Sequence, residues 1–245
     1  MSEYLLEGID FSNIRIMDAG TGAGRTTLLL ASRLEEARSK GKIVSVDIDP
    51  DTFSYVRGKL GALARFVNFT KAGLNHMPQI RDESFDLVVC AATLCALNYR
   101  QLGALRGLTE FRRVLRKGGR LLISEEFPLP KATQPEEEVQ VMHWQMYKSV
   151  AELVEGEHWT EIYPEELKFA ASLIGFRDIE WRRFRGEPLR KETMEEWKEV
   201  MPTMVNKMED EAMRRACSVL IREIYRKFEE RGGMGSPCYV MKMTK

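Results

Sequence analysis

The sequence predicts an α/β protein of doubly wound, three-layer architecture, in which helices cover both faces of a mostly parallel sheet. Short apolar runs alternate along the chain with longer segments of helical periodicity, and this alternation is typical of parallel sheets. The runs begin near Ile14, Ile43, Arg65, Phe85, Arg120 and Arg177. A glycine-rich turn directly after the first run also favours this fold, because ligands of such sheets bind beyond the carboxyl ends of the strands.

The glycine-rich turn contains three alternating glycines, Gly20, Gly22 and Gly24, and a helical pattern begins after them, near Arg25. Glycine suits a turn that needs positive φ or a backbone that a ligand approaches closely. The free N–H groups and the positive dipole end of the helix would point at that ligand. The residues exclude the dinucleotide fingerprint, whose third glycine position is Arg25, and the Walker loop, since no lysine follows Gly24. The turn therefore predicts a small polar ligand.

The second apolar run, residues 42–47, ends in an acid, Asp47, as the first run ends in Asp18 and Ala19. Such an acid can accept hydrogen bonds from the two hydroxyls of a ribose. We predict that Asp49 is the N-cap of the next helix and that Pro50 is its first residue. The alternative, that both acids only cap this helix, explains Asp49 well but Asp47 poorly, because Asp47 lies two residues too early.

Several motifs follow one another in a recognisable order. Asp18 lies two residues before the first glycine, and the segments 84–90, 111–125 and 164–180 come later in the chain. In this order, over residues 14–184, they resemble the class I S-adenosylmethionine-dependent methyltransferase family, in particular its small-molecule subgroup. The resemblance implies S-adenosyl-L-methionine as the cofactor and, for residues 237–243, a seventh strand that is antiparallel to the others.

The resemblance also implies which residues bind the cofactor. They are Asp18, Gly20, Thr21, Gly22, Gly24, Asp47, Ile48, Gly73, Leu74, Asn75 and Cys90. One position departs from the family pattern, because Gly73 stands where relatives often have an acid that binds the adenine amino group. The adenine edge would then be met by Asn75, by the backbone of Leu74 or by water.

Two helical stretches do not belong to the predicted core. We expect a cofactor-binding core at residues 1–126, continued at 161–184 and completed by a last strand at 236–245. Residues 127–160 and 185–235 are helical insertions between these parts. Their apolar residues recur at helical spacing, and we place Leu153, Met213 and Leu220 on the apolar faces. We expect the first to be a lid over the acceptor and the second to be a lid or a face for homodimerisation. Simple packing is the alternative for both.

The acceptor is expected to be a small molecule. Residues 90–93 lack the Asn/Asp-Pro-Pro-aromatic signature of methyltransferases that act on nucleic-acid bases. His143, Tyr147 and His158 are candidates for the acceptor pocket, although a lone histidine is more often structural. No catalytic residue is identified, because alignment of an activated methyl group needs no fixed one. The spacing of His, Cys, Asp and Glu predicts no metal site.

Composition excludes some function classes. The formal net charge is zero and no basic block is present, so extended nucleic-acid binding is not expected. No apolar run reaches the length of a membrane span, and residues 1–4 do not resemble a signal peptide. The four scattered cysteines favour a cytoplasmic protein with reduced thiols. A methyltransferase acting on protein or RNA, and a non-catalytic module that binds the cofactor, are the alternative functions.

Overall fold

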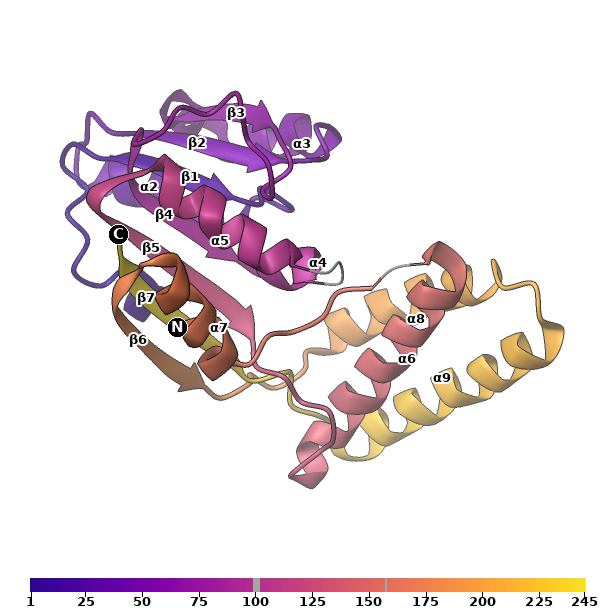
Figure 1. The fold of residues 1–245 in the computed structure, drawn as a ribbon. Helices are drawn as coiled ribbons and strands as arrows, with labels where there is room; N and C mark the ends of the chain where they lie inside the picture. Colours follow the sequence, from indigo (N-terminus) through magenta and orange to yellow (C-terminus); the bar gives the residue numbers. More distant parts are fainter. Residues whose placement is uncertain (99–101, 157) are drawn as a thin grey trace. The chain divides into compact units, whose positions relative to one another are not determined.

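The computed structural model describes residues 1–98, 102–156 and 158–245, and two compact units divide the chain (Figure 1). Unit 1 comprises Met1–Glu125, Glu161–Arg182 and Tyr239–Lys245. Unit 2 comprises Glu126–Thr160 and Arg183–Cys238. The chain therefore leaves unit 1 twice to build unit 2, first after the fifth strand and again after the sixth.

Unit 1 is built on a sheet of seven strands in the order β3-β2-β1-β4-β5-β7-β6, as far as the described residues show. The strands are β1 (Arg15–Ala19), β2 (Lys42–Asp47), β3 (Val67–Lys71), β4 (Phe85–Ala91), β5 (Leu115–Glu126), β6 (Arg177–Phe184) and β7 (Cys238–Thr244). The first five pair in parallel. Next to β5, Gly118 N–H donates to Lys245 O and Lys245 N–H donates back to Gly119 O, which makes β7 antiparallel to β5. The predicted fold class is confirmed.

Helices cover both faces of this sheet (Figure 1). Those of unit 1 are α1 (Ser2–Leu6), α2 (Arg25–Glu36), α3 (Asp51–Leu60), α4 (Leu94–Asn98), α5 (Gly103–Val114) and α7 (Pro164–Ile174), with a 3-10 helix at Gly61–Phe66. The apolar stripe of α5 shows why such segments dock on a sheet. Leu108, Phe111 and Val114 recur every three residues and are fully buried.

The central strands are apolar almost throughout, because a parallel sheet is buried on both faces. β1 is buried from Ile16 to Ala19, and in β4 the run from Leu87 to Cys90 is buried. Polar side chains interrupt this apolar layer at a few positions, which include Ser124 and Glu125 at the end of β5. Asp18 in β1 and Ser45 in β2 are fully buried, and they lie opposite each other in the parallel register.

Three predicted boundaries need correction. The strand predicted near Arg65 begins at Val67, because residues 61–66 form the 3-10 helix. The helix predicted to start at Pro50 begins at Asp51, so Pro50 and not Asp49 occupies the N-cap position. The strand predicted near Arg120 already begins at Leu115, since an irregularity opposite Phe85 and Leu87 accommodates Gly118 at φ 74° within the strand.

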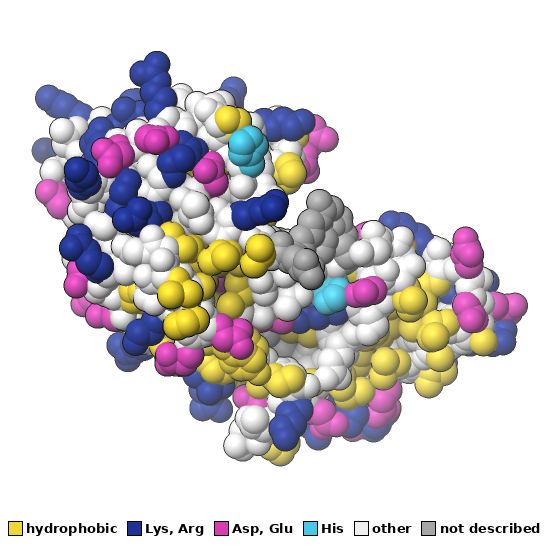
Figure 2. Space-filling model, in the orientation of Figure 1, with side chains coloured by type: hydrophobic (Ala, Val, Ile, Leu, Met, Phe, Trp, Pro, Cys, Tyr) yellow, Lys and Arg dark blue, Asp and Glu magenta, His cyan; other side chains and the backbone are white. Residues whose placement is uncertain are grey.

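Unit 2 consists mainly of three helices, α6 (Glu138–Glu155), α8 (Lys191–Val205) and α9 (Glu211–Arg231), with a 3-10 helix at Pro135–Glu137. A core rich in methionine joins them: Val139, Met146, Val150, Met194, Met201, Met204, Met208, Ile221 and Ile224 are buried together. The sequence periodicity also placed Leu153, Met213 and Leu220 on the apolar faces, but these side chains are exposed. Figure 2 shows hydrophobic side chains at the surface of these helices.

None of the helices formed by the described residues combines the length and the apolar character that crossing a membrane requires.

Candidate functional site

The glycine-rich turn closes the carboxyl end of β1 and is anchored on the neighbouring strand. The N–H groups of Gly20 and Thr21 both donate to the carbonyl of Val46, at 2.9 and 3.1 Å. Gly24 N–H donates to Thr21 O at 2.8 Å, and α2 begins at the next residue. The φ angles of the three glycines are 95°, 45° and 81°, a region that side chains rarely tolerate. The turn thus requires glycine, as the sequence predicts.

The three glycines differ in what surrounds them. A Cβ atom on Gly20 would lie 2.2 Å from Thr93 Oγ1, and one on Gly24 would lie 2.6 Å from Val56 Cγ1. A Cβ atom on Gly22 would meet nothing within 4 Å. Gly20 and Gly24 therefore permit close packing, whereas Gly22 borders open space in which a ligand can approach the backbone. No side chain of the described residues caps α2, so its first N–H groups are available to a ligand.

Asp18 lies directly beneath this turn and is completely buried. Its Oδ2 accepts hydrogen bonds from Thr27 Oγ1 at 2.5 Å and from Ser45 Oγ at 2.9 Å. Thr21 Oγ1 joins the same network through Ser45 Oγ at 2.7 Å. The other oxygen, Oδ1, is buried and has no hydrogen-bond partner among the described residues. A buried acceptor without a donor is rare in native structures and indicates that a ligand or an ordered water supplies one.

The environment of Asp18 also changes its acidity. Burial raises the pKa of this carboxyl to about 7, against the opposing effect of the hydrogen bonds from Thr27 and Ser45. The nearby carboxylate of Asp47 contributes to this rise. A cationic donor placed at Oδ1 would favour the ionised form of Asp18. The α-ammonium of an amino-acid ligand has this character.

Asp47 ends β2 and faces the same turn. Its Oδ2 accepts from Gly22 N–H at 2.8 Å and its Oδ1 accepts from Asp49 N–H at 3.0 Å. An ionised carboxylate has about four lone-pair positions, so two remain for a ligand. Two vicinal hydroxyls of a ribose would complete the set. The structure therefore brings Asp47 to the open side of the glycine turn, as the ribose prediction requires.

The residues predicted to surround the adenine also lie together. Ala72 N–H donates to Asp47 O at 2.9 Å, which holds the segment after β3 beside the end of β2. Gly73 is close to both Asn75 and Ile48, because a Cβ atom on it would lie 3.1 Å from Asn75 Oδ1 and 4.0 Å from Ile48 Cδ1. Ile48 is 71% exposed, and Leu74 is buried. An exposed aliphatic side chain at this edge offers an apolar face to a flat ring.

The end of β4 is held by a buried acid that the sequence analysis did not single out. Glu125, near the end of β5, accepts from the N–H groups of Thr93 and Leu94 at 2.8 and 2.7 Å. These amides open α4, so the carboxylate compensates the positive end of that helix. Burial raises the pKa of Glu125 despite these hydrogen bonds. Cys90 is buried opposite Ala19, and burial raises the pKa of its thiol. Cys90 therefore contributes to packing at this edge.

Four residues of the site were thus missed: Thr27, Ser45, Thr93 and Glu125. Thr27 and Ser45 could have been found, because each is a polar residue in an otherwise apolar helix face or strand. Thr93 and Glu125 gave no such signal. Glu125 lies 31–32 residues from its hydrogen-bond partners Leu94 and Thr93, and Thr93 meets Gly20 only because the chain folds.

The three candidates for the acceptor pocket all belong to unit 2. His143 is 2% exposed and its ring stacks on Trp197, with 3.4 Å between the ring centroids. Its two ring nitrogens have no hydrogen-bond partner among the described residues, and burial lowers its pKa to about 3. Tyr147 contacts the ring of Trp159, with 5.0 Å between centroids. His158 Nδ1 lies 2.5 Å from Glu152 Oε2. Because its pKa is about 3, His143 is neutral at physiological pH.

Within the described residues, no group of three or more His, Cys, Asp or Glu side chains is arranged to hold a metal ion. All four cysteines are free thiols.

From β1 to β3, the carboxyl edge of the sheet presents first a partner for an ammonium group, then acceptors for two hydroxyls, and finally an apolar face for a ring. This order matches an amino acid joined to a nucleoside. Unit 1 accordingly has a fold of the doubly wound α/β class, and its candidate site lies at the point where strand order reverses.

Comparison with known proteins narrows this class. A family model described as a methyltransferase domain matches residues 10–171. The chain is 34% identical over 125 residues to the demethylmenaquinone methyltransferase of Deinococcus radiodurans, a match that covers 51% of this chain and 47% of that protein. It is 33% identical over 118 residues to the demethylmenaquinone methyltransferase of Thermus thermophilus, covering 48% of this chain and 49% of that protein. The chain therefore spans about half the length of the curated relatives it matches.

A solved structure extends the likeness to the whole fold. The cyclopropane-fatty-acyl-phospholipid synthase-like protein of Lactobacillus casei has a TM-score of 0.66 and 16% identity, and the match covers 100% of this chain and 89% of that one. The chain belongs to the class I S-adenosylmethionine-dependent methyltransferase family. This membership confirms the predicted family and S-adenosyl-L-methionine as its cofactor. The roles of the individual residues at the site remain predictions.

The buried Asp18 should make stability depend on pH. Its pKa rises on folding, from an ordinary value of 3.8 to about 7. Between these two pH values Asp18 is protonated in the folded protein and ionised in the unfolded chain. The stability that this protonation gives the folded protein is lost as the pH rises through 7. We expect the free energy of unfolding to fall by up to about 4 kcal/mol between about pH 4 and pH 8. Asp18→Asn should remove the contribution of Asp18 and leave that of Glu125, whose pKa burial also raises, whereas Asp10→Asn, an exposed control, should keep both. Urea unfolding would measure the effect, and equal slopes for all three proteins would contradict it.

The glycines should separate packing from ligand binding. Gly20→Ala should lower the free energy of unfolding by about 2 kcal/mol or more, because its Cβ atom overlaps Thr93. Gly22→Ala should cost only about 1 kcal/mol, for the positive φ, while strongly weakening the binding of S-adenosylhomocysteine. Thermal unfolding and calorimetric titration measure the two effects. Normal binding by a folded Gly22→Ala protein would show that the turn only reverses the chain.

Proposed function

We propose that this chain transfers a methyl group from S-adenosyl-L-methionine to a small-molecule acceptor by in-line displacement. The observation that carries the proposal is the partnerless, buried Oδ1 of Asp18 beneath a glycine turn whose Gly22 borders open space. Both features fit the amino-acid part of the cofactor. Asp47 fits the ribose, since its carboxylate retains acceptor positions on the open side of the turn.

The chain's residues would hold the cofactor at three points. Asp18 and the first N–H groups of α2 would bind its ammonium and carboxylate groups. Asp47 would accept from both ribose hydroxyls. Ile48 would cover one face of the adenine, whose edge would be met by Asn75 or by the backbone of Leu74.

Rate enhancement in this arrangement comes chiefly from positioning. S-adenosyl-L-methionine supplies an electrophilic methyl group on a sulfonium centre when it is bound. The protein then has to hold the acceptor in line and exclude water, which together can lower a barrier by roughly 7–11 kcal/mol. We assign no general base, and burial makes His143 too weak a base for this role at neutral pH.

Two observations support a small acceptor over a protein or RNA. The formal net charge of the chain is zero, so no general excess of cations attracts a polyanion. The curated relatives that match about half of this chain are demethylmenaquinone methyltransferases, named for a small molecule.

Unit 2 offers surfaces that suit a planar acceptor. Trp144, Tyr147 and Trp159 are half-buried, and their rings lie 5.0 to 6.1 Å apart between centroids. Aromatic faces of this kind stack on flat apolar rings. We infer that Tyr147 contacts the acceptor. His143, which stacks on Trp197, and His158 are further candidates. Tyr147→Ala should then raise the KM for the acceptor while leaving cofactor affinity unchanged.

The proposed function can be tested without knowing the acceptor. Calorimetric titration with S-adenosylmethionine and S-adenosylhomocysteine measures cofactor binding. Incubation with S-adenosylmethionine and a metabolite extract, followed by mass spectrometry, should reveal products that have gained one methyl group. Binding without any methylated product, in extracts that also contain protein and RNA, would favour a non-catalytic binding module.

Asp47 and Asp49 form a matched pair for testing the ribose assignment. Asp47→Ala removes charge-assisted hydrogen bonds and should weaken cofactor binding by about 1.5–3 kcal/mol. Asp49→Ala removes the acceptor that now binds Asp51 N–H at 3.0 Å, and should cost about 1 kcal/mol of stability with little effect on affinity. Titration of both variants with S-adenosylhomocysteine measures the difference. The reverse order of affinities would show that Asp47 does not bind the ribose.

A further inference from the structure

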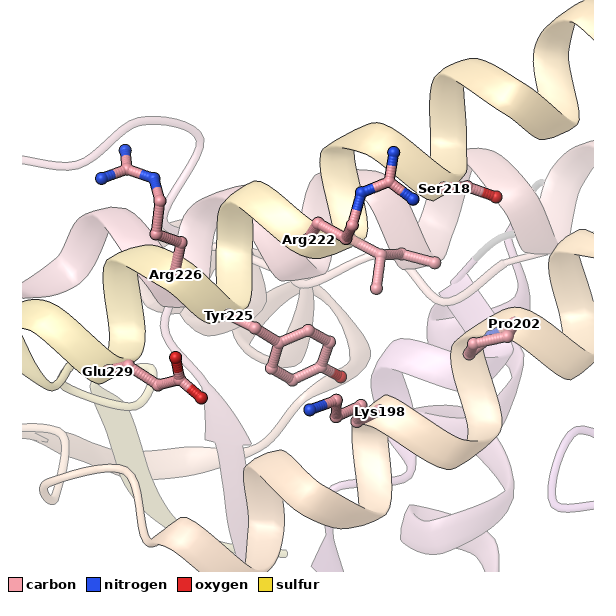
Figure 3. Close-up of a pocket in the computed structure, with 8 residues that line it drawn as sticks. Lys198, Pro202, Ser218, Arg222, Tyr225, Arg226 and Glu229 are labelled. Carbon is pink, nitrogen blue, oxygen red and sulfur yellow. The ribbon is translucent and has the colours of Figure 1, made fainter.

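Helices α8 and α9 of unit 2 enclose a groove that the proposed methyl transfer does not use. Its volume is about 500 Å³, and an adjoining hollow of about 320 Å³ shares three of its lining residues, Lys198, Tyr225 and Glu229. Figure 3 shows side chains from both helices lining it. None of the residues that line it belongs to the cofactor site of unit 1.

Tyr225 is the polar centre of this groove. Its side chain projects from α9 toward α8 (Figure 3), and the residue is only 9% exposed. Its hydroxyl is buried and has no hydrogen-bond partner among the described residues. Burial raises the pKa of Tyr225 to about 12, so the group remains a neutral O–H donor at physiological pH. A buried donor without an acceptor is unfavourable, and an acceptor on a ligand would satisfy it.

The charges around Tyr225 favour an anion. The Lys198 ammonium lies 5.6 Å from the centroid of the Tyr225 ring. Lys198 and Arg222 form no ion pair with any carboxylate of the described residues, whereas Arg226 is paired with both Glu223 and Glu230. Glu229 is the opposing carboxylate of the groove. Two unpaired cations against one carboxylate leave a net positive charge next to a hydroxyl donor.

Apolar side chains make up much of the remaining lining. The exceptions are Ser218 in the groove and Lys191 and Glu195 in the adjoining hollow, which pair with each other at 3.8 Å. Ile221 and Pro202 line the groove, and Met194 and Phe228 line the adjoining hollow. A ligand that reaches from Tyr225 across these residues would bury a hydrocarbon body as well as a charged end. Burial of such surface stabilises a complex by roughly 25 cal/mol per Å² before the costs of association.

We propose that this groove binds a small amphipathic anion, whose charged group contacts Tyr225 Oη and Lys198 Nζ and whose apolar body packs on Ile221 and Phe228. Arg222 supplies the second cation. The charged group is a carboxylate or a phosphate, since both accept hydrogen bonds and carry negative charge. The proposal is independent of methyl transfer.

Calorimetric titration with decanoate and with decyl phosphate tests the class and distinguishes its two members. We expect at least one to bind, with decanol and decyltrimethylammonium binding at least about tenfold more weakly. Tyr225→Phe and Lys198→Met should each weaken binding of the anion by about tenfold or more. Lys207→Met removes a lysine just beyond α8 that does not line the groove, and should leave binding unchanged.

Glu229→Gln sharpens the test, because removing the opposing carboxylate should strengthen the binding of an anion. Tyr225→Phe keeps the ring and removes an unsatisfied hydroxyl, so its melting temperature should be unchanged or higher. Affinity for S-adenosylhomocysteine should stay the same in every variant, which separates this site from the cofactor site. Equal binding of decanol and decanoate, or anion binding that Lys198→Met and Tyr225→Phe leave intact, would overturn the proposal.

Discussion

The site of unit 1 depends on the burial of one carboxyl group, that of Asp18. Its Oδ2 holds Thr27 of α2 and Ser45 of β2, so a helix and two strands are joined at the base of the glycine turn. Desolvation of this acid is unfavourable, and two hydrogen bonds to one oxygen compensate it only in part. The other oxygen remains available to a ligand. The same group thus joins the elements that hold the turn, and it is where we propose that the ammonium group of the cofactor binds.

A second buried acid, Glu125, holds the segment that follows β4. Its carboxylate binds the N–H groups that open α4, and Thr93 of that segment packs against Gly20. The glycine turn is therefore confined from below by Asp18 and from the side by Thr93. Of its three glycines, Gly22 is the one whose Cβ position faces open space. Confinement of this kind pre-organises a backbone for binding, because little conformational freedom is left to be lost.

Unit 2 is stabilised by a different chemistry. Its three helices share a core in which methionines predominate, and flexible methionine side chains adapt to irregular spaces. The rings of Trp144, Tyr147 and Trp197 lie around His143, whereas α8 and α9 line a groove with a polar centre and apolar walls. Partnerless buried atoms occur at His143 and at Tyr225. Such atoms also occur at Arg112 and Gln140, and we propose that a ligand supplies the missing partner only at Asp18 and Tyr225, which lie beside open space or a groove.

The sequence by itself determined the fold class, the glycine turn and the positions of Asp18, Asp47 and Ile48, because strand ends and turns are encoded by neighbouring residues. It placed α6 but misjudged the exposure of Leu153, since periodicity does not say which partner covers a helix face. Only the tertiary structure decided that Glu125 caps α4, that Thr93 meets Gly20, and that Lys198 and Tyr225 share a groove. These contacts join residues 27 to 73 positions apart, and such pairings arise when elements pack.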